Sequence, residues 1–328
     1  MTTPLLRVQG LRTWFPIKAG VFRKTVGHVQ AVTDVDLEIE AGSTLALVGE
    51  SGCGKTTVGR SILGLTPSQS GRVEFEGADL RGLSQTAWRP YRRDLQIIFQ
   101  DPMASLDPRM RVRDSVAEGM RSFGLGRDES ERTERVQQLF ERVQLDPDHI
   151  WRYPHEFSGG QRQRICIARA LAVEPKLIVC DEAVSALDVS IQAQILNLLA
   201  DLQSELGLAY LFITHDLGVV RYLADRVAVM YLGQIVESGP TASIFANPLH
   251  PYTRGLLKAV PSIDPHRRGG APPVEGDVPS PSAPPSGCYF HTRCSDVMEQ
   301  CRTQAPAVYG EGPQRARCFL ADPSGAPR

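Results

Sequence analysis

Glycines, a lysine and a threonine follow one another closely near residue 50, in the spacing GxxxxGK[ST]. Glycines in this pattern let backbone N–H groups face the phosphates of a nucleotide, the lysine adds a positive charge, and the hydroxyl can hold Mg²⁺. We therefore predict a phosphate loop that binds a nucleoside triphosphate. Its residues are Gly49, Glu50, Ser51, Gly52, Cys53, Gly54, Lys55, Thr56 and Thr57.

Two adjacent acids follow an apolar run in the stretch Leu177-Ile-Val-Cys-Asp181-Glu182. An apolar run of this length is typical of a strand inside a parallel sheet, so both acids would lie at its carboxyl end. There Asp181 could hold the Mg²⁺ shell while Glu182 polarises a water for attack on the γ-phosphate. Without a phosphate loop these acids would more simply form a solvated turn; with the loop, catalysis is the better interpretation.

The elements around these residues indicate an α/β fold. Residues 44–48 read as a buried strand that runs directly into the phosphate loop, and residues 57–65 read as the helix that follows it. Further strands are expected at 72–76, 95–99, 177–180 and 209–213, with an amphipathic helix at 191–206 that ends at Gly207. Strands that are apolar on both faces belong inside a sheet covered by helices, which predicts a P-loop NTPase core.

The composition changes twice along the chain. Residues 109–145 are charged and helical in pattern, which indicates a helical insert, and residues 261–287 are rich in Pro, Gly and Ser. We expect a nucleotide-binding domain over 1–260, with its helical subdomain at about 101–172. A Pro-rich linker over 261–287 and a cysteine-rich extension over 288–328 would follow.

The bulk numbers exclude some functions. The 328 residues carry 36 Lys and Arg against 37 Asp and Glu, a net charge of −1, so no electrostatic footprint for nucleic acid is expected. No apolar run approaches the roughly 18 to 20 residues that cross a bilayer, and the first ten residues lack a leader pattern. The chain is expected to be cytosolic, with any membrane role peripheral.

Taken in order, the motifs resemble those of the ATP-binding subunits of ABC transporters. The nucleotide-binding domain of these subunits is built on the P-loop NTPase fold. To the loop and the acids the sequence adds Phe99-Gln100-Asp-Pro, Phe157-Ser-Gly-Gly-Gln161, Ser185-Ala-Leu-Asp188 and Thr214-His215-Asp. The resemblance implies that ATP with Mg²⁺ is bound between two subunits and hydrolysed.

The resemblance also implies roles for single residues. The signature residues Ser158, Gly159, Gly160 and Gln161 would cap the γ-phosphate held by the opposite subunit, at a helix N-terminus that favours anions. Gln100 would sense Mg²⁺, His215 would contact the γ-phosphate, and Asp188 would lie at the dimer seam.

Three positions carry open alternatives. Phe15, or Trp14 in its place, aligns with the aromatic that stacks on adenine, but a core aromatic is also compatible with this position. Ala183 stands where the family usually has Pro, which loosens the turn without removing either acid. Cys53 lies at a helix start that favours a thiolate, although a small spacer is the interpretation we prefer.

A second set of motifs resembles the F-type ATPases of dipeptide and oligopeptide importers. It comprises Asn247-Pro-Leu-His-Pro-Tyr-Thr-Arg-Gly-Leu-Leu257, Arg152-Tyr-Pro-His155, Phe157 to Arg164 and Val184 to Ser190. The resemblance implies a heterodimer with a D-type ATPase on the cytoplasmic face of the inner membrane, two permeases and an external peptide-binding protein. Importers of nickel, glutathione and other small solutes share this tail. A soluble ABC ATPase without a transport role, or a catalytically weak partner subunit, is the remaining alternative.

Four cysteines lie close together in the last part of the chain, at Cys288, Cys294, Cys301 and Cys318. Four thiolates suit a [4Fe-4S] cluster or a tetrahedral Zn²⁺, although the first two gaps are wider than those of zinc fingers. The resemblance to peptide importer ATPases favours the iron–sulfur cluster, and free thiols are the simpler alternative.

Overall fold

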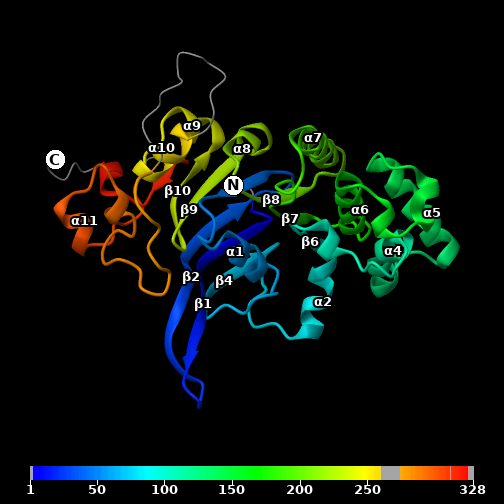
Figure 1. Ribbon diagram of the computed structural model, residues 1–328, viewed down its shortest axis with the longest axis horizontal. Helices are drawn as coiled ribbons and strands as arrows, with labels where there is room; N and C mark the ends of the chain where they lie inside the picture. Colours follow the sequence, from blue (N-terminus) through cyan, green and yellow to red (C-terminus); the bar gives the residue numbers. More distant parts are fainter. Residues whose placement is uncertain (1–2, 260–273, 311, 324–328) are drawn as a thin grey trace. The chain divides into compact units, whose positions relative to one another are not determined.

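The computed structural model describes residues 3–259, 274–310 and 312–323, which form two compact units (Figure 1). The first unit comprises the chain up to Ile39, Thr44–Arg81 and the chain from Thr214 onward. The second comprises Glu40–Ser43 and Gly82–Ile213. Residues 261–273 of the expected linker lie outside the described residues.

The first unit contains an antiparallel sheet in the order β2-β1-β4-β5. Its strands are β1 (Leu6–Ala19), β2 (Lys24–Ile39), β4 (Ser70–Phe75) and β5 (Ala78–Asp79). β1 and β2 form the long hairpin drawn in blue in Figure 1. Near the end of β2, Val35, Leu37 and Ile39 are buried and alternate with exposed residues, so one face of this hairpin packs on the core.

A second group of strands in this unit carries the phosphate loop. β3 (Thr44–Val48) pairs in parallel with β9 (Arg226–Tyr231), β9 pairs antiparallel with β10 (Gln234–Pro240), and β10 pairs with β11 (Arg315–Ala316). Every residue of β3 is buried, as expected of a strand covered on both faces. The helices of the unit are α1 (Lys55–Ile62), α8 (Leu217–Leu223), α9 (Thr241–Ala246), α10 (Pro251–Lys258) and α11 (Glu299–Thr303).

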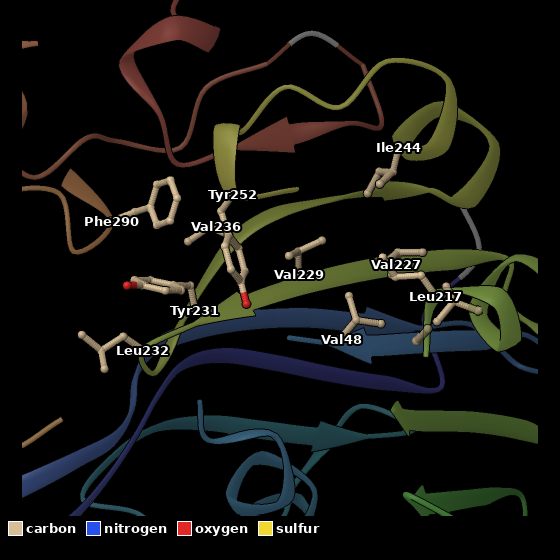
Figure 2. Close-up of a cluster of buried hydrophobic side chains, with 12 residues drawn as sticks. Val48, Leu217, Val227, Val229, Tyr231, Leu232, Val236, Ile244, Tyr252 and Phe290 are labelled. Carbon is tan, nitrogen blue, oxygen red and sulfur yellow. The ribbon is translucent and has the colours of Figure 1, made fainter. Parts of the chain in front are cut away.

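Three aromatic rings join remote segments of this unit in one buried cluster (Figure 2). The ring centre of Tyr231, at the end of β9, lies 4.8 Å from that of Tyr252 in α10. It lies 5.2 Å from the ring centre of Phe290, in an edge-to-face arrangement. Phe290 and Tyr252 are 5.4 Å apart. Each of these rings is almost completely buried, so the segment around Phe290 is held to the same core as β3 and β9.

The second unit contains three parallel strands, β6 (Leu95–Ile98), β7 (Leu177–Asp181) and β8 (Ala209–Thr214). β7 and β8 are buried throughout, so the strands expected from apolar runs are confirmed. The helices of the unit are α2 (Gln85–Asp94), α3 (Pro102–Ser105), α4 (Val112–Phe123), α5 (Glu129–Arg142), α6 (Gly159–Leu171) and α7 (Val189–Leu206), with short 3₁₀ turns at Pro147–Trp151 and Pro154–Glu156. The mixed α/β nucleotide-binding fold predicted from the sequence is therefore confirmed.

No helix in the described part of the chain is long and apolar enough to cross a membrane.

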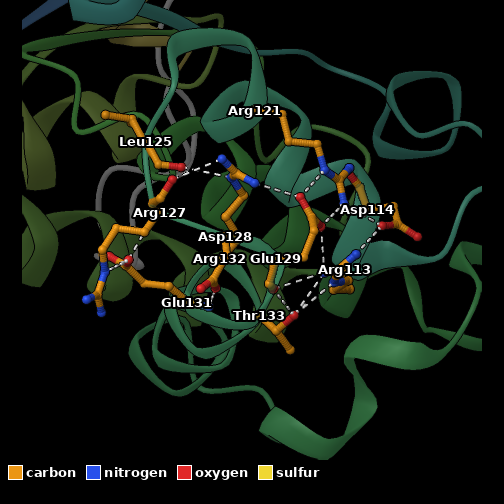
Figure 3. A network of polar contacts seen from close by, with 11 residues as sticks. Arg113, Asp114, Arg121, Leu125, Arg127, Asp128, Glu129, Glu131, Arg132 and Thr133 are labelled. Carbon is orange, nitrogen blue, oxygen red and sulfur yellow. Dashed lines mark hydrogen bonds and ion pairs between the residues drawn. The ribbon is translucent and has the colours of Figure 1, made fainter.

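An ion-pair network joins α4 and α5 (Figure 3). The Glu129 carboxylate accepts hydrogen bonds of 2.7 to 3.0 Å from Arg113, Arg121 and Arg132. Asp114 accepts from Arg113 and Arg121 as well, at 2.7 and 2.8 Å. The hydrogen bonds from Arg121 and Arg132 lower the pKa of Glu129 to about 2, because they favour its ionised form.

Replacing Glu129 by Gln is expected to make the protein less stable at neutral pH but not near pH 2. A carboxylate whose pKa is lowered by folding stabilises the fold fully when the pH is above its pKa in the unfolded chain, 4.5. This stabilisation is lost as the pH falls toward the folded-state pKa of about 2. Urea unfolding of wild type and variant between pH 7 and pH 2 measures this, with the exposed Glu141→Gln on the same helix as control. A difference between wild type and Glu129→Gln that stays constant down to pH 2 would contradict the assignment.

Candidate functional site

The phosphate loop leaves the carboxyl end of β3 and enters α1. Gly52 and Gly54 have φ values of 78° and 108°, a region that residues with a Cβ rarely adopt. A Cβ on Gly54 would lie 2.0 Å from the carbonyl oxygen of Ala31, whereas one on Gly52 would meet no atom within 4 Å. The two glycines thus serve different purposes, because only Gly54 is also required by close packing.

The ammonium of Lys55 lies within the loop. Lys55 is buried, and its Nζ donates hydrogen bonds to the carbonyl oxygens of Gly49 and Glu50, both at 2.9 Å. A positive charge is therefore held among the backbone groups of the loop, where an anionic phosphate would be attracted.

Cys53 in the same loop is 3% exposed, and burial raises the pKa of its thiol despite the neighbouring Lys55. The expectation that the helix start favours a thiolate is therefore wrong, because the cost of burying the charge exceeds the effect of the lysine. The structure supports the interpretation of Cys53 as a small spacer.

In the second unit the structure brings Gln100 and Glu182 together. Gln100 Nε2 donates to Glu182 Oε2 at 2.9 Å, and the Glu182 amide donates to the carbonyl of Ile213 at 3.0 Å. Glu182 has a φ of 50°, an uncommon value for a residue with a side chain. Asp181 is buried at the end of β7, and Ala183 is buried after the pair. The two acids thus occupy the carboxyl end of the strand, as the sequence predicted.

The signature residues form the start of α6. Ser158 is the N-cap: its Oγ accepts from the Gln161 amide at 3.3 Å, while the Gln161 side chain accepts from the Ser158 amide at 2.9 Å. Gly160 packs against α7, since a Cβ there would lie 2.5 Å from Ile191. Ser158 and Gly159 are exposed. Asp188 caps α7, and its hydrogen bonds from Ser190 and the Ile191 amide lower its pKa.

The aromatic candidates differ in their surroundings. Phe15 in β1 is 43% exposed, so the alternative of a core aromatic is wrong for it. Trp14 is partly buried; its Nε1 donates to Thr33 at 3.0 Å and Arg12 stacks 5.1 Å from its ring centre. Phe15 is therefore the better candidate to stack on a base.

The candidates are distributed over both units. The phosphate loop, Phe15 and His215, which follows β8, belong to the first, and the second contains Gln100, Asp181, Glu182, the start of α6 and Asp188.

The four cysteines of the tail do not support the metal prediction. Among the described residues, which include all four, no group of three or more His, Cys, Asp or Glu is placed to hold a metal ion. Burial raises the pKa of Cys294 to about 12 and that of Cys318 to about 11. The four cysteines form no disulfide, and the described residues give no support for a [4Fe-4S] cluster or Zn²⁺.

Two residues that sequence reasoning missed contact the loop. The Glu50 amide donates to the hydroxyl of Tyr252 at 3.0 Å, and the guanidinium of Arg293 donates to both Glu50 carboxylate oxygens at 2.7 and 3.0 Å. Tyr252 belongs to the motif Asn247 to Leu257, whose sequence alone does not indicate a role at the phosphate loop. No spacing or motif points to Arg293, which lies 243 residues from Glu50.

Comparison with known proteins identifies the family. The model of the ABC transporter family matches residues 32–185, and that of the oligopeptide/dipeptide transporter C-terminal region matches residues 236–301. A "Probable peptide ABC transporter ATP-binding protein" of Sinorhizobium fredii is 49% identical over 99% of this chain and 92% of its own length. The chain belongs to the ATP-binding proteins of this ABC transporter family. It is therefore an ATPase subunit that couples ATP hydrolysis to import.

Other relatives and solved structures agree with this. A glutathione import ATP-binding protein of Salmonella typhimurium is 55% identical over 84% of this chain, which corresponds to 44% of that longer protein. The structure of cbiO1 from Clostridium perfringens, part of an ABC transporter complex, gives a TM-score of 0.63 at 28% identity and covers 75% of this chain and 92% of that one. The ATP-binding cassette MJ0796, solved as a dimer bound to ADP and phosphate, gives 0.63 at 26% identity, covering 72% and 98%.

Alanine at Gly54 is expected to destabilise the protein much more than alanine at Gly52. Both substitutions place a Cβ at positive φ, which costs about 1 to 2 kcal/mol, but only the one at Gly54 also displaces backbone. Denaturant unfolding of the two nucleotide-free variants compares the costs, and each variant is the control for the other. Equal losses of unfolding free energy would show that close packing at Gly54 is unimportant.

Proposed function

We propose that this chain powers the import of dipeptides or oligopeptides from the cytoplasmic face of the inner membrane. The match of residues 236–301 to the oligopeptide/dipeptide C-terminal region carries this proposal, since that region distinguishes this branch from other ABC ATPases. A glutathione importer is the second candidate, because a relative named for glutathione import is 55% identical to this chain. Glutathione is itself a short peptide-like solute, so both candidates share a chemical class.

Within the proposed site, Gly49–Thr57 binds the phosphates of ATP through backbone N–H groups and Lys55. Thr56, Gln100 and Asp181 offer the hydroxyl, amide and carboxylate oxygens that Mg²⁺ prefers, and this ion neutralises phosphate charge when it is bound. Phe15 stacks on the adenine, and its exposed ring supports this role.

Glu182 is proposed as the base that polarises the attacking water, and His215 as the contact to the γ-phosphate. The hydrogen bond from Gln100 supports the role of Glu182, because it fixes the orientation of the carboxylate.

A second ATPase subunit is proposed to complete each site. The exposed N-terminus of α6, with Ser158 and Gly159 at its end, offers a positive dipole to an anion outside this chain. Gln161 and Gly160 belong to the same signature, and Asp188 is proposed to lie at the seam between the two subunits. We propose a D-type ATPase as this partner, together with two permeases and an external peptide-binding protein.

The domain division also stays a proposal: ATP-binding over 1–260 with a helical subdomain near 101–172, then the linker 261–287 and the extension 288–328. A tail metal is not part of the proposed mechanism.

Replacing Glu182 by Gln is expected to lower the ATP turnover number by about 10² to 10⁴, while ATP binding is retained. The amide keeps the shape of the side chain but cannot accept a proton. Steady-state phosphate release measures turnover, and equilibrium binding of a fluorescent ATP analogue measures affinity. Glu205→Gln, a substitution of an exposed glutamate in α7, is the control and should change neither. Wild-type turnover by Glu182→Gln would refute the role of Glu182.

The importer role is tested by purifying the tagged chain from membranes and identifying the co-purifying proteins by mass spectrometry. We expect a second ATPase and two polytopic permeases in equal amounts. A chain that purifies from the membrane fraction with ribosomal or DNA-repair proteins instead would contradict transport and favour the soluble ABC ATPase.

A further inference from the structure

The first polar residue of the phosphate loop is held from two places in the C-terminal part of the chain. Tyr252 in α10 accepts a hydrogen bond from the Glu50 amide, and Arg293 forms a bidentate ion pair with the Glu50 carboxylate. These residues lie 202 and 243 positions further along the chain. All three belong to the same compact unit. The loop is therefore connected to the region that distinguishes this branch of the family.

The ion pair is sheltered from water. The Arg293 side chain is 5% exposed and that of Glu50 28% exposed, so this pair is screened less than a surface pair. Arg293 also lies 5.7 Å from the ring centre of Tyr231, within range of a cation–π interaction. The position of its guanidinium is thus fixed by the aromatic cluster of Figure 2, where Tyr231, Tyr252 and Phe290 pack together.

The residues His250, Pro251 and Tyr252 each contribute to this arrangement. His250 Nδ1 accepts from the Tyr252 amide at 3.0 Å and caps α10, and Pro251 occupies the first helical position. Burial lowers the pKa of His250 to about 3, so the imidazole is neutral and can accept this bond at physiological pH. The helix therefore starts at a fixed point, from which the hydroxyl of Tyr252 reaches the loop.

Holding Glu50 also orients the groups that would bind phosphate. The Glu50 carbonyl accepts hydrogen bonds from Lys55 Nζ at 2.9 Å and from the Cys53 amide at 3.3 Å. A rotation of the Glu50 peptide would disturb both the ammonium and the turn that follows. Because a loop without regular structure loses conformational entropy on binding, fixing it in advance strengthens binding.

We propose that Arg293 and Tyr252 are positioning residues that hold the phosphate loop, through Glu50, in the conformation that binds ATP. The inference rests on the proposed role of the loop residues Gly49–Thr57. It assigns to the C-terminal region a part in nucleotide affinity, in addition to any contact with transporter partners. Both residues act through Glu50, so the expected effect is on binding and not on the chemical step.

The test is a comparison of ATP affinity and turnover in the purified full chain, using a fluorescent ATP analogue for Kd and phosphate release for KM and kcat. Arg293→Ala acts on ATP only indirectly, through Glu50, and is expected to raise Kd and KM for ATP by about tenfold while kcat changes less than about twofold. Arg293→Lys keeps the charge but loses the bidentate geometry, so it should recover part of the affinity. Tyr252→Phe, which keeps the packed ring, should raise Kd by a smaller factor.

A double-mutant cycle shows whether Arg293 acts through Glu50. In a Glu50→Ala background, Arg293→Ala should weaken ATP binding by much less than in wild type, because the pair is already broken. The control is Arg302→Ala, an exposed arginine in α11 of the same tail, which should leave Kd unchanged. Thermal unfolding of each variant confirms that the binding measurements are made on folded protein.

Two outcomes separate this inference from the proposed function. If Lys55→Ala binds ATP as wild type does, the proposed role of the phosphate loop fails. If Lys55→Ala loses ATP binding while Arg293→Ala and Tyr252→Phe both bind with wild-type Kd, only the positioning role is overturned. A loss in Arg293→Ala that is equally large in the Glu50→Ala background would also overturn it.

Discussion

The whole site depends on the backbone of one short loop, which must present its N–H groups to an anion without a regular hydrogen-bonded ladder to hold it. Part of the constraint is local, since Gly54 fits under the Ala31 carbonyl only without a side chain. The rest is supplied from a distance, where Tyr252 and Arg293 fix the amide and the carboxylate of Glu50. A sheltered ion pair is suited to this purpose. Its bidentate geometry defines the position of the Glu50 carboxylate, even though such a pair contributes little net stability to the fold.

A second group of site residues, Glu182 and Gln100, has a different requirement. A general base must present its carboxylate at a defined angle, and Glu182, the base proposed above, has a strained backbone conformation at the end of a buried strand. Gln100 follows β6, the strand next to β7, and its side-chain amide donates the hydrogen bond that orients the Glu182 carboxylate.

Much of this could be predicted from the sequence because the signals are local. The run Thr44–Val48 into a glycine loop, the apolar strand before Asp181, and the Ser158 and Gln161 capping box are each encoded within a few residues. α7 begins two residues before the periodic pattern because Asp188 caps it. What failed depends on tertiary packing: Cys53 is buried where a helix start favours a thiolate. The contact of Arg293 with Glu50 has no local signature at all.

The central claim is that the C-terminal region holds the phosphate loop in its binding conformation before ATP arrives. Hydrogen–deuterium exchange of the nucleotide-free protein tests it most directly, by comparing the amides of residues 49–54 in wild type and Arg293→Ala. Faster exchange of these amides in the variant, with β3 and α1 unchanged and with protection restored by saturating ATP, is the predicted result. Identical exchange of the loop in the two proteins would contradict the claim.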